Sequence, residues 1–519
     1  MAAFWLLLLF VASAVLVLRT WRARSIISKA RQAGPTYPPG LEPYPLIGHL
    51  PQFLANRHRV LDWMTEFLER QTTCTFVLRR PGGVRGAITA NPANVEHFLR
   101  TSFDRYPKGP RFSLLLNDFL GRGIFNADGE AWRAQRKVAS HEFNTRSLRA
   151  FVARCVHTEL HGRLLPLLRR AAASGSPLDL QDALERFAFD NICRVAFDHD
   201  PCQLPDDGDA GADSSFADAF RDAENLSAGR FRYALPGFWK IKKALNVGSE
   251  KRLRESIAMV HDFADRIIQS RREEMLTAGF DKHDLLSRFM ASQDETYSES
   301  EVPLRDVVIS FLLAGRETTS SALTWFFWLL SSRPDLQRRI RDEVAAVRAR
   351  RRAQGDVDSI VGFDLDELRE MHYVHAAITE SMRLYPPVPI NSLRAETDDV
   401  LPDGTAVQAG WFVAYNSYAM GRMKSVWGDD AREYRPERWL NTGDGTFRPD
   451  SPFRFVAFHA GPRLCLGKEM AYIQMKSIVA CVLEELDVAV DGAHQPRPVA
   501  SLTLRMADGL PVTVKPRRD

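Results

Sequence analysis

Residues 304–332 are apolar on most sides of a helical projection and end just before Pro334, which predicts one long buried helix. At ~1.5 Å per residue such a helix would cross a large domain. A membrane-spanning helix is the alternative interpretation. It fails because Arg316 and Glu317 divide the apolar residues into pieces too short to cross a bilayer.

The middle of this predicted helix has unusual chemistry for a core segment, because it reads Ala314-Gly315-Arg316-Glu317-Thr318-Thr319. Ala314 and Gly315 remove side-chain bulk, so a ligand could lie against the backbone. Glu317 places an acid beside a hydroxyl. Thr318 could donate a hydrogen bond to the carbonyl of Ala314 or distort the local turn.

Cys465 lies in a glycine-flanked loop before a predicted helix over residues 468–483. The positive end of a helix dipole favours thiolate over thiol, and the thiolate is the form that binds metals. Gly461 and Gly467 let the backbone pass close to a flat ligand. Arg463 supplies a planar cationic fork suited to a carboxylate. A buried structural cysteine is the alternative interpretation, and it is the better one for a cysteine without this surrounding pattern.

Two further residue pairs have helical spacing. Glu380 and Arg383 are three residues apart, and a Tyr-Pro-Pro run follows them directly. Trp132 and Arg136 are four residues apart, behind Asp128 as a plausible N-cap. Both spacings place the two side chains on one helix face. Each pair alone also fits an amphipathic surface helix.

Together these motifs resemble those of the cytochrome P-450 superfamily. The loop from Phe458 to Gly467 has the pattern Phe-x-x-Gly-x-Arg-x-Cys-x-Gly of its haem-ligand loop, and residues 314–319 resemble its oxygen-activating helix. Glu380, Arg383 and Arg438 resemble its buried Glu-Arg-Arg network, whose role is structural. The resemblance implies a mainly α fold with small β-sheets (α+β), a haem b cofactor, and O2 and NADPH as co-substrates.

The resemblance also implies a role for each motif residue. Cys465 would be the axial thiolate ligand of the haem iron. Thr318 would hold the dioxygen and its proton-donating water, and Glu317 would feed protons in, so these two are the candidate catalytic residues. The candidate cofactor-binding residues are Cys465, Arg463, Trp132, Arg136, Arg394, Phe458 and Gly461.

Several shorter strings, among them residues 119–126, 314–320 and 462–477, resemble plant fatty-acid ω-hydroxylases. The implied activity is hydroxylation of the terminal carbon of medium- or long-chain fatty acids, and oxidation of jasmonoyl-amino-acid conjugates is an alternative. Arg111 is the candidate for the carboxylate anchor. The candidate pocket residues are apolar, which suits an acyl chain; they are Phe112, Leu115, Leu313, Ala314, Ile390, Met506 and Leu510.

Two other classes stay open. One is a haem-thiolate isomerase or dehydratase that needs no reductase, and the other is a non-catalytic haem-binding membrane protein. The intact pair Glu317-Thr318 counts against both. Because the sequence has no flavin or nicotinamide fingerprint, the resemblance implies electron supply by NADPH–cytochrome P-450 reductase, with Arg463, Lys468 and Lys476 as candidate contacts.

The motifs are spread from Trp132 to Cys465 and have to converge on one cofactor, so we expect one large domain over residues 52–519. An apolar fraction of 45% suits a sizeable core. The net charge of +4 without a dense Lys/Arg tract makes nucleic acid an unfavourable partner. The six cysteines lack paired spacing, which suggests neither zinc nor a disulfide framework.

Residues 2–18 are apolar apart from Ser13 and are followed by Arg19, Arg22 and Arg24. We expect residues 1–24 to form a single-pass anchor in the endoplasmic reticulum membrane, with the catalytic domain cytosolic. A cleavable signal peptide is the alternative, but no positive segment precedes the apolar run. Residues 25–51 predict a proline-rich linker. Residues 204–215 predict an acidic surface loop, and the turns at 402–404 and 507–509 predict hairpins.

Overall fold

The computed structural model describes residues 41–143, 146–204, 215–233, 237–278, 284–291, 303–353, 362–492 and 494–517. The expected anchor, most of the expected linker and most of the expected acidic loop lie outside these residues. Within them, no helix is both long and apolar enough to cross a bilayer. The described chain is mainly helical with four small sheets, which confirms the expected α+β class.

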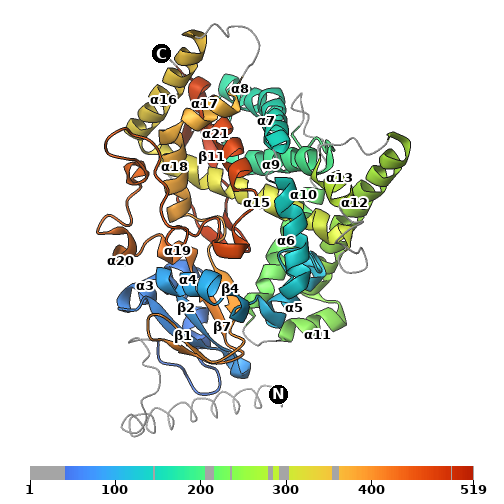
Figure 1. Ribbon diagram of the computed structural model, residues 1–519, viewed down its shortest axis with the longest axis vertical. Helices are drawn as coiled ribbons and strands as arrows, with labels where there is room; N and C mark the ends of the chain where they lie inside the picture. The colour runs from blue at the N-terminus through green and yellow to red at the C-terminus, as the bar shows by residue number, and fades with distance from the viewer. Residues whose placement is uncertain are drawn as a thin grey trace, which may run out of the picture.

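Helices make up most of the structure (Figure 1). The α-helices are α2 (Leu50–Ala55), α3 (Val60–Arg70), α4 (Pro92–Glu96), α5 (Gly109–Leu120), α6 (Gly129–Phe143), α7 (Arg146–Glu159), α8 (Leu165–Ser174), α9 (Leu180–Phe197), α10 (Ser215–Gly229), α11 (Phe238–Leu245), α12 (Gly248–Ala278), α13 (Leu285–Ala291), α15 (Leu304–Ser331), α16 (Pro334–Ala353), α17 (Leu365–Glu370), α18 (His372–Leu384), α19 (Ser417–Met420), α20 (Lys424–Trp427) and α21 (Lys468–Glu485). The short 3-10 or π turns are η1 (Pro81–Gly83), η2 (His97–Thr101), η3 (Phe103–Arg105), η4 (Leu160–Leu164), η5 (Arg230–Arg232), η6 (Pro436–Trp439) and η7 (Gly461–Arg463).

The strands form one four-stranded sheet of order β1-β2-β7-β4 and three smaller sheets, β3-β11-β8, β9-β10 and β5-β6. Their bounds are β1 (Thr75–Arg79), β2 (Arg85–Thr89), β3 (Leu178–Asp179), β4 (Asn391–Arg394), β5 (Asp399–Val400), β6 (Ala406–Val407), β7 (Phe412–Tyr415), β8 (Leu486–Val490), β9 (Pro498–Ala500), β10 (Leu504–Met506) and β11 (Pro511–Pro516). All described pairings are antiparallel except β2 with β7. Figure 1 shows the four-stranded sheet at one end of the molecule, beside α5.

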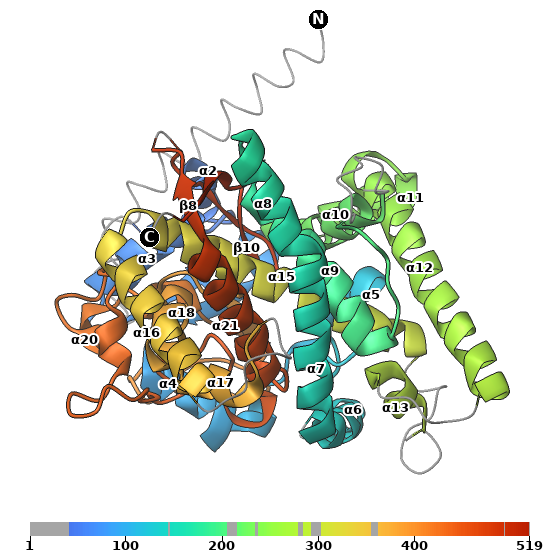
Figure 2. The same ribbon diagram turned by 90° about the horizontal axis from the view of Figure 1, so that it is seen from above.

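Helix α15 runs through the helical part, as the sequence predicted for residues 304–332. Its 28 residues span about 42 Å at ~1.5 Å per residue. Helices α9, α18 and α21 pack against it, and α9 and α21 lie beside it in the view from above (Figure 2). Trp325 and Phe326 near its C-terminal end are at most 1% exposed, so the helix is buried from several sides at once.

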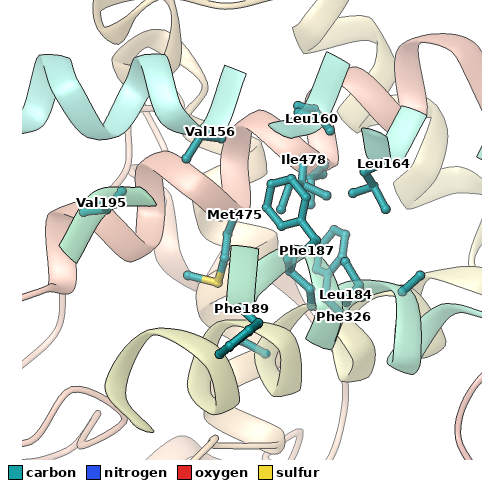
Figure 3. Close-up of a cluster of buried hydrophobic side chains, with 14 of the residues drawn as sticks. Val156, Leu160, Leu164, Leu184, Phe187, Phe189, Val195, Phe326, Met475 and Ile478 are labelled. Carbon is teal, nitrogen blue, oxygen red and sulfur yellow. The ribbon is translucent and has the colours of Figure 1, made fainter. Parts of the chain in front are cut away.

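The main core forms where α7, α9, α15 and α21 meet (Figure 3). Phe187 from α9 and Phe326 from α15 are completely buried there, and Met475 and Ile478 from α21 close the cluster. Full burial of one such side chain stabilises a fold by roughly 1.5–3 kcal/mol. This core therefore fixes α21, and the loop that precedes it, relative to α15.

One of the two predicted hairpins is confirmed. Strands β5 and β6 pair around the turn at residues 402–404. The prediction for residues 507–509 is wrong, because β10 pairs with β9 while β11 pairs with β3 and β8. The last hairpin therefore turns one loop earlier, at Ser501–Thr503, where the backbone N–H of Ser501 donates to the carbonyl of Thr503 at 3.0 Å.

Candidate active site

Cys465 lies between η7 and the start of α21. Its backbone N–H donates to the carbonyl of Phe458 at 2.8 Å, which closes the loop. Gly461 has a φ of +59°, and a Cβ atom there would lie 1.9 Å from the carbonyl oxygen of Leu99. Only glycine fits that position. The loop thus has one conformation, which presents the Cys465 thiol beside the first turn of α21.

The electrostatics of Cys465 differ from the sequence expectation. Burial raises the pKa of its thiol, although the backbone N–H of Gly467 and the cations Arg136 and Lys468 act in the opposite direction. The start of α21 alone therefore does not suffice to hold a thiolate. A metal cation deprotonates a coordinating thiol outright. We therefore expect Cys465 to be a thiolate when a metal cation is bound to it.

Helix α15 has an accessible face opposite buried charges. Ala314 is exposed and Thr318 partly exposed, whereas Arg316 and Glu317 are each only 1% exposed. The Thr318 hydroxyl donates to the carbonyl of Ala314 at 2.6 Å, as predicted. The expectation for Gly315 is wrong. A Cβ atom there would lie 2.4 Å from Ile192 of α9. This glycine therefore allows close packing of α9 against α15, and the space beside it is not open to a ligand.

Glu317 belongs to a buried charged cluster on the α10 side of α15. Its Oε1 lies 2.9 Å from Nη1 of Arg316. Glu224 of α10 is completely buried and accepts hydrogen bonds from the backbone N–H and the hydroxyl of Thr503. Burial and then the charge of Glu317 raise the pKa of Glu224 to about 8. Glu224 can therefore hold a proton at neutral pH, a role that no sequence spacing indicated.

Arg463 is held by Asp128 and by one of the expected residues, Trp132. Its Nη2 donates to Oδ1 of Asp128 at 2.6 Å, and its guanidinium lies 4.6 Å from the ring centroid of Trp132. Arg136 donates to the carbonyl of Leu464, next to the cysteine. The Asp128 carboxylate bonds the backbone N–H groups at the start of α5, not those in the first turn of α6 as the N-cap prediction required.

Two basic side chains that the sequence did not single out for this site lie near Arg463. Burial and then Arg463 lower the pKa of Lys108 to about 7. Burial and then Lys108 lower the pKa of His459 to about 3, and its Nδ1 lies 2.8 Å from the hydroxyl of Tyr415. Nε of Arg463 is buried without a hydrogen-bond partner among the described residues. A bound carboxylate would satisfy this donor and offset the cationic repulsion.

These features fit a haem. The thiol can bind the iron, Ala314 and Thr318 leave an accessible helix face, and the orphan donor of Arg463 with Lys108 suits propionates. Phe458 packs against Tyr472 with ring centroids 5.3 Å apart. Arg394 lies beside the Lys108 segment, because its backbone N–H donates to the carbonyl of Pro107 at 2.8 Å, and its Nε lies 3.7 Å from Glu396; its role at a propionate stays a prediction.

The Glu380 network has the geometry that the motif predicted. Glu380 is completely buried and accepts two hydrogen bonds from Arg383 at 2.7 Å, one from Nε and one from Nη2. Arg438 donates to the same carboxylate at 3.4 Å, and Trp439 donates at 2.8 Å. Arg383 also donates to the carbonyls of Ala431 and Glu433. The network joins α18 to the loop that leads to Cys465.

The candidate pocket residues divide into two groups. Leu313 is 8% exposed within the main core, Phe112 and Ile390 pack against that core, and Leu115 of α5 is 7% exposed. Met506, at the end of β10, and Leu510, just before β11, are at most 2% exposed. Their backbones bond Gln181 and Asp179 at the start of α9, so they are core residues there. The actual hairpin tip carries Leu502, which is only partly buried.

The expected reductase contacts are largely wrong. Lys476 is 5% exposed and donates to the carbonyl of Leu368, so it cannot meet a partner. Arg463 points into the fold toward Asp128. Lys468 is exposed at the start of α21. Exposed Lys137 on α6 is a further basic residue that the motif reading overlooked, because helical spacing alone does not show which face of α6 is free.

Comparison with known proteins gives consistent matches. A sequence model of the family Cytochrome P450 matches residues 38–511. Cytochrome P450 CYP94D108 of Paris polyphylla is 51% identical over 469 residues, which cover 90% of each chain. Cytochrome P450 94A1 of Vicia sativa is 45% identical over 91% of this chain and 90% of its own. Cytochrome P450 94B1 of Arabidopsis thaliana is 44% identical over 94% and 93%.

Proposed function

This chain belongs to the cytochrome P450 family and is a haem-thiolate monooxygenase, and from that premise we propose that it hydroxylates the terminal carbon of medium- and long-chain fatty acids. The enzyme uses O2 and electrons that come from NADPH through a reductase, and it acts on a lipophilic substrate. The isomerase, dehydratase and non-catalytic alternatives are thereby excluded. The conjugate of jasmonate with an amino acid remains the second candidate substrate.

Apolar side chains that pack against the core containing α15 support the fatty-acid proposal. Leu313 precedes Ala314 directly, and Phe112, Ile390 and Leu502 are partly buried side chains that pack against the same core. Apolar side chains suit an acyl chain and offer few partners to a polar conjugate. A terminal methyl group is harder to oxidise than the CH2 beside it, so the regiochemistry has to come from the orientation of the bound chain.

The roles of the residues follow from their positions. When bound, haem supplies the activation of dioxygen and the insertion of one oxygen atom into a C–H bond. Cys465 would hold it, with Arg463, Trp132, Arg136 and Lys108 at the propionates. The Thr318 hydroxyl would hold the water that delivers protons, while Glu317, together with the protonated Glu224, would resupply them.

Replacing Thr318 with alanine tests this proton route. We expect near-normal haem content and NADPH consumption, but several-fold less product per NADPH, with the lost electrons recovered as hydrogen peroxide, because the hydroxyl positions a proton donor without supporting the fold. NADPH, product and peroxide are measured in one assay. Thr319→Ala, at the buried neighbour, is the matched control. Wild-type coupling in Thr318→Ala would refute the role.

The substrate proposal is tested by incubating the full chain and a reductase with fatty acids of graded length and with a jasmonoyl-amino acid. We expect terminal hydroxylation of the fatty acids, identified by mass spectrometry of the products. Faster turnover of the jasmonoyl conjugate than of every fatty acid would contradict the proposed substrate class. In-chain products alone would contradict the regiochemistry.

We also propose that residues 1–24 anchor the enzyme in the endoplasmic reticulum membrane, with residues 25–51 as linker and residues 52–519 as one cytosolic domain. Helix α11 supports membrane contact, because Ile241 and Leu245 are 55% and 67% exposed next to Lys242 and Lys243. Such an apolar face with flanking cations suits an anionic bilayer surface. Protection of a C-terminal tag from protease in sealed microsomes would overturn the orientation.

A further inference from the structure

A cleft of about 480 Å³ lies between the four-stranded sheet and the start of helix α5. The turn before β2, strand β4 and the loop before β7 form one wall, and Lys108 to Phe112 form the other. Helix α5 contacts β4, and Figure 1 shows the two side by side. This cleft is separate from Cys465, which does not line it.

The cleft is strongly cationic. Arg85, Lys108, Arg111 and Arg394 line it, and no acidic side chain lines it among the described residues. No ion pair is recorded for Arg85 or Arg111 within the described chain, and Arg394 has only Glu396, at 3.7 Å, as its recorded ion-pair partner there. Four cations around one cleft without a matching anion indicate a binding site for a negatively charged group.

Burial adds to the need for an anion at Arg111. Burial lowers the pKa of Arg111, whose guanidinium lies 5.3 Å from the ring centroid of Phe412. Burial and then the charge of Arg111 lower the pKa of nearby Arg80 to about 10. The guanidinium of Arg80 is occupied by the carbonyls of Phe231 and Tyr233. Arg111 therefore keeps its donors for a ligand.

The remaining lining of the cleft is apolar. Phe112 and Phe231 pack with ring centroids 5.6 Å apart, and Trp411 and Phe412 lie on the sheet side. Phe112 also packs against the main core that contains Leu313 of α15. An amphipathic acid can thus place its charged end among the arginines and its chain along Phe112 toward α15.

We infer that this cleft binds the carboxylate of the substrate, with Arg111 and Arg85 as the anchoring cations. The inference rests on the proposed function and deepens it. If the carboxylate is anchored at the sheet, the opposite end of the acyl chain is directed toward Thr318, which accounts for oxidation at the terminal carbon. An arginine fork suits a carboxylate better than the point charge of a lysine does.

Haem propionates are a second source of carboxylates near this cleft. Lys108 senses the charge of Arg463 and belongs to that cluster as well. Arg85 and Arg111 have no recorded contact with Arg463, Trp132 or Arg136 in the described chain. Variants at these two arginines therefore distinguish a substrate carboxylate from a propionate.

The test compares Arg111→Gln and Arg85→Gln in the haem-loaded full chain. The probes are dodecanoate and its uncharged methyl ester, and binding is followed by the change in the haem absorption spectrum. We expect dodecanoate to bind at least about tenfold more weakly to each variant and the ester to bind as to the wild type, because only the acid loses a charge-assisted hydrogen bond, and tenfold corresponds to about 1.4 kcal/mol. Arg111→Lys should recover part of the affinity.

Exposed Arg254 on α12 supplies the matched control, Arg254→Gln, which should leave both affinities unchanged. Unchanged dodecanoate affinity in Arg111→Gln and Arg85→Gln would overturn the inference. An equal loss for acid and ester would show a packing role, and a loss of haem would assign the arginines to propionates; both results also overturn it. If the wild type accepts only the jasmonoyl conjugate, the proposed substrate fails. The cleft is then tested with that conjugate and its methyl ester. A loss of affinity that is confined to the free acid supports carboxylate binding in the cleft.

Discussion

Replacing Cys465 with serine should abolish hydroxylation completely and remove the thiolate signature from the absorption spectrum of the ferrous carbon monoxide complex. The Sγ atom lies at the end of a loop that Gly461 and the Cys465–Phe458 hydrogen bond hold in one conformation. A serine hydroxyl in that position cannot supply the soft anionic ligand that thiolate provides. Because the change is nearly isosteric, the variant should still fold.

The measurement is a carbon monoxide difference spectrum beside a circular dichroism spectrum. All six cysteines lie in the described residues and none of them forms a disulfide there, but only Cys202 is exposed. Cys202→Ser is therefore the matched control and should keep the full signature. The buried cysteines are poorer controls, since serine would bury a hydroxyl in the core. Retention of the thiolate band in Cys465→Ser would mean that another residue binds the iron.

Local patterns predicted much of this site. The apolar stretch at residues 304–332, the helix after Cys465 and the spacing of Glu380 and Arg383 depend on contacts within a few residues. The structure has each of them: α15, α21 and a buried pair at 2.7 Å. The hydrogen bond from Thr318 to Ala314 is also local, since it spans one helical turn. Periodicity is sufficient for features of this range.

Features that depend on packing between distant elements could not be predicted in this way. Gly315 of α15 packs closely against Ile192 of α9, and the buried Lys476 donates a hydrogen bond to the carbonyl of Leu368. The sequence predicts the last hairpin turn at residues 507–509, whereas the structure has it at Ser501–Thr503. The difference arises because Ala-Asp-Gly is a stronger local turn signal than Ser501–Thr503. The partner that decides the pairing, β9, is known only from the folded chain.

The same limit applies to the two charged clusters. Burial and then the carboxylate of Glu317 on a different helix raise the pKa of Glu224, and Arg85 and Arg111 line one cleft because α5 lies against the sheet. In the sequence Glu224 and Arg85 look like ordinary surface charges, and Arg111 is named as a carboxylate anchor without any pattern that places it beside Arg85. Burial without a matching counter-charge distinguishes Glu224 and Arg111, and burial depends on the whole fold.

Replacing Glu380 with glutamine should be the most destabilising single change in the network around α18. Within the described residues its carboxylate accepts five N–H bonds: two from Arg383 and one each from Arg438, Trp439 and the backbone of Arg435. Glutamine keeps the shape but removes the carboxylate charge that faces buried Arg383, and it leaves Arg438 with Asp430, at 3.1 Å, as its other carboxylate partner. Leaving such charges unpaired costs roughly 3–5 kcal/mol.

That cost is comparable to the whole stability of many domains, ~5–15 kcal/mol, so we expect little folded, haem-containing Glu380→Gln protein at growth temperature. Glu370→Gln is the matched control. Glu370 is about half exposed and pairs with Arg350 at the surface, where an ion pair contributes only ~0–1 kcal/mol. The thermal midpoint and the haem-to-protein ratio measure the effect. A Glu380→Gln enzyme that melts with the wild type and keeps its haem would show that the backbone carbonyl acceptors of Arg383, and Asp430 with the carbonyl acceptors of Arg438, suffice to compensate the two guanidinium groups. The network would then serve to orient the loop before Cys465 without stabilising the fold.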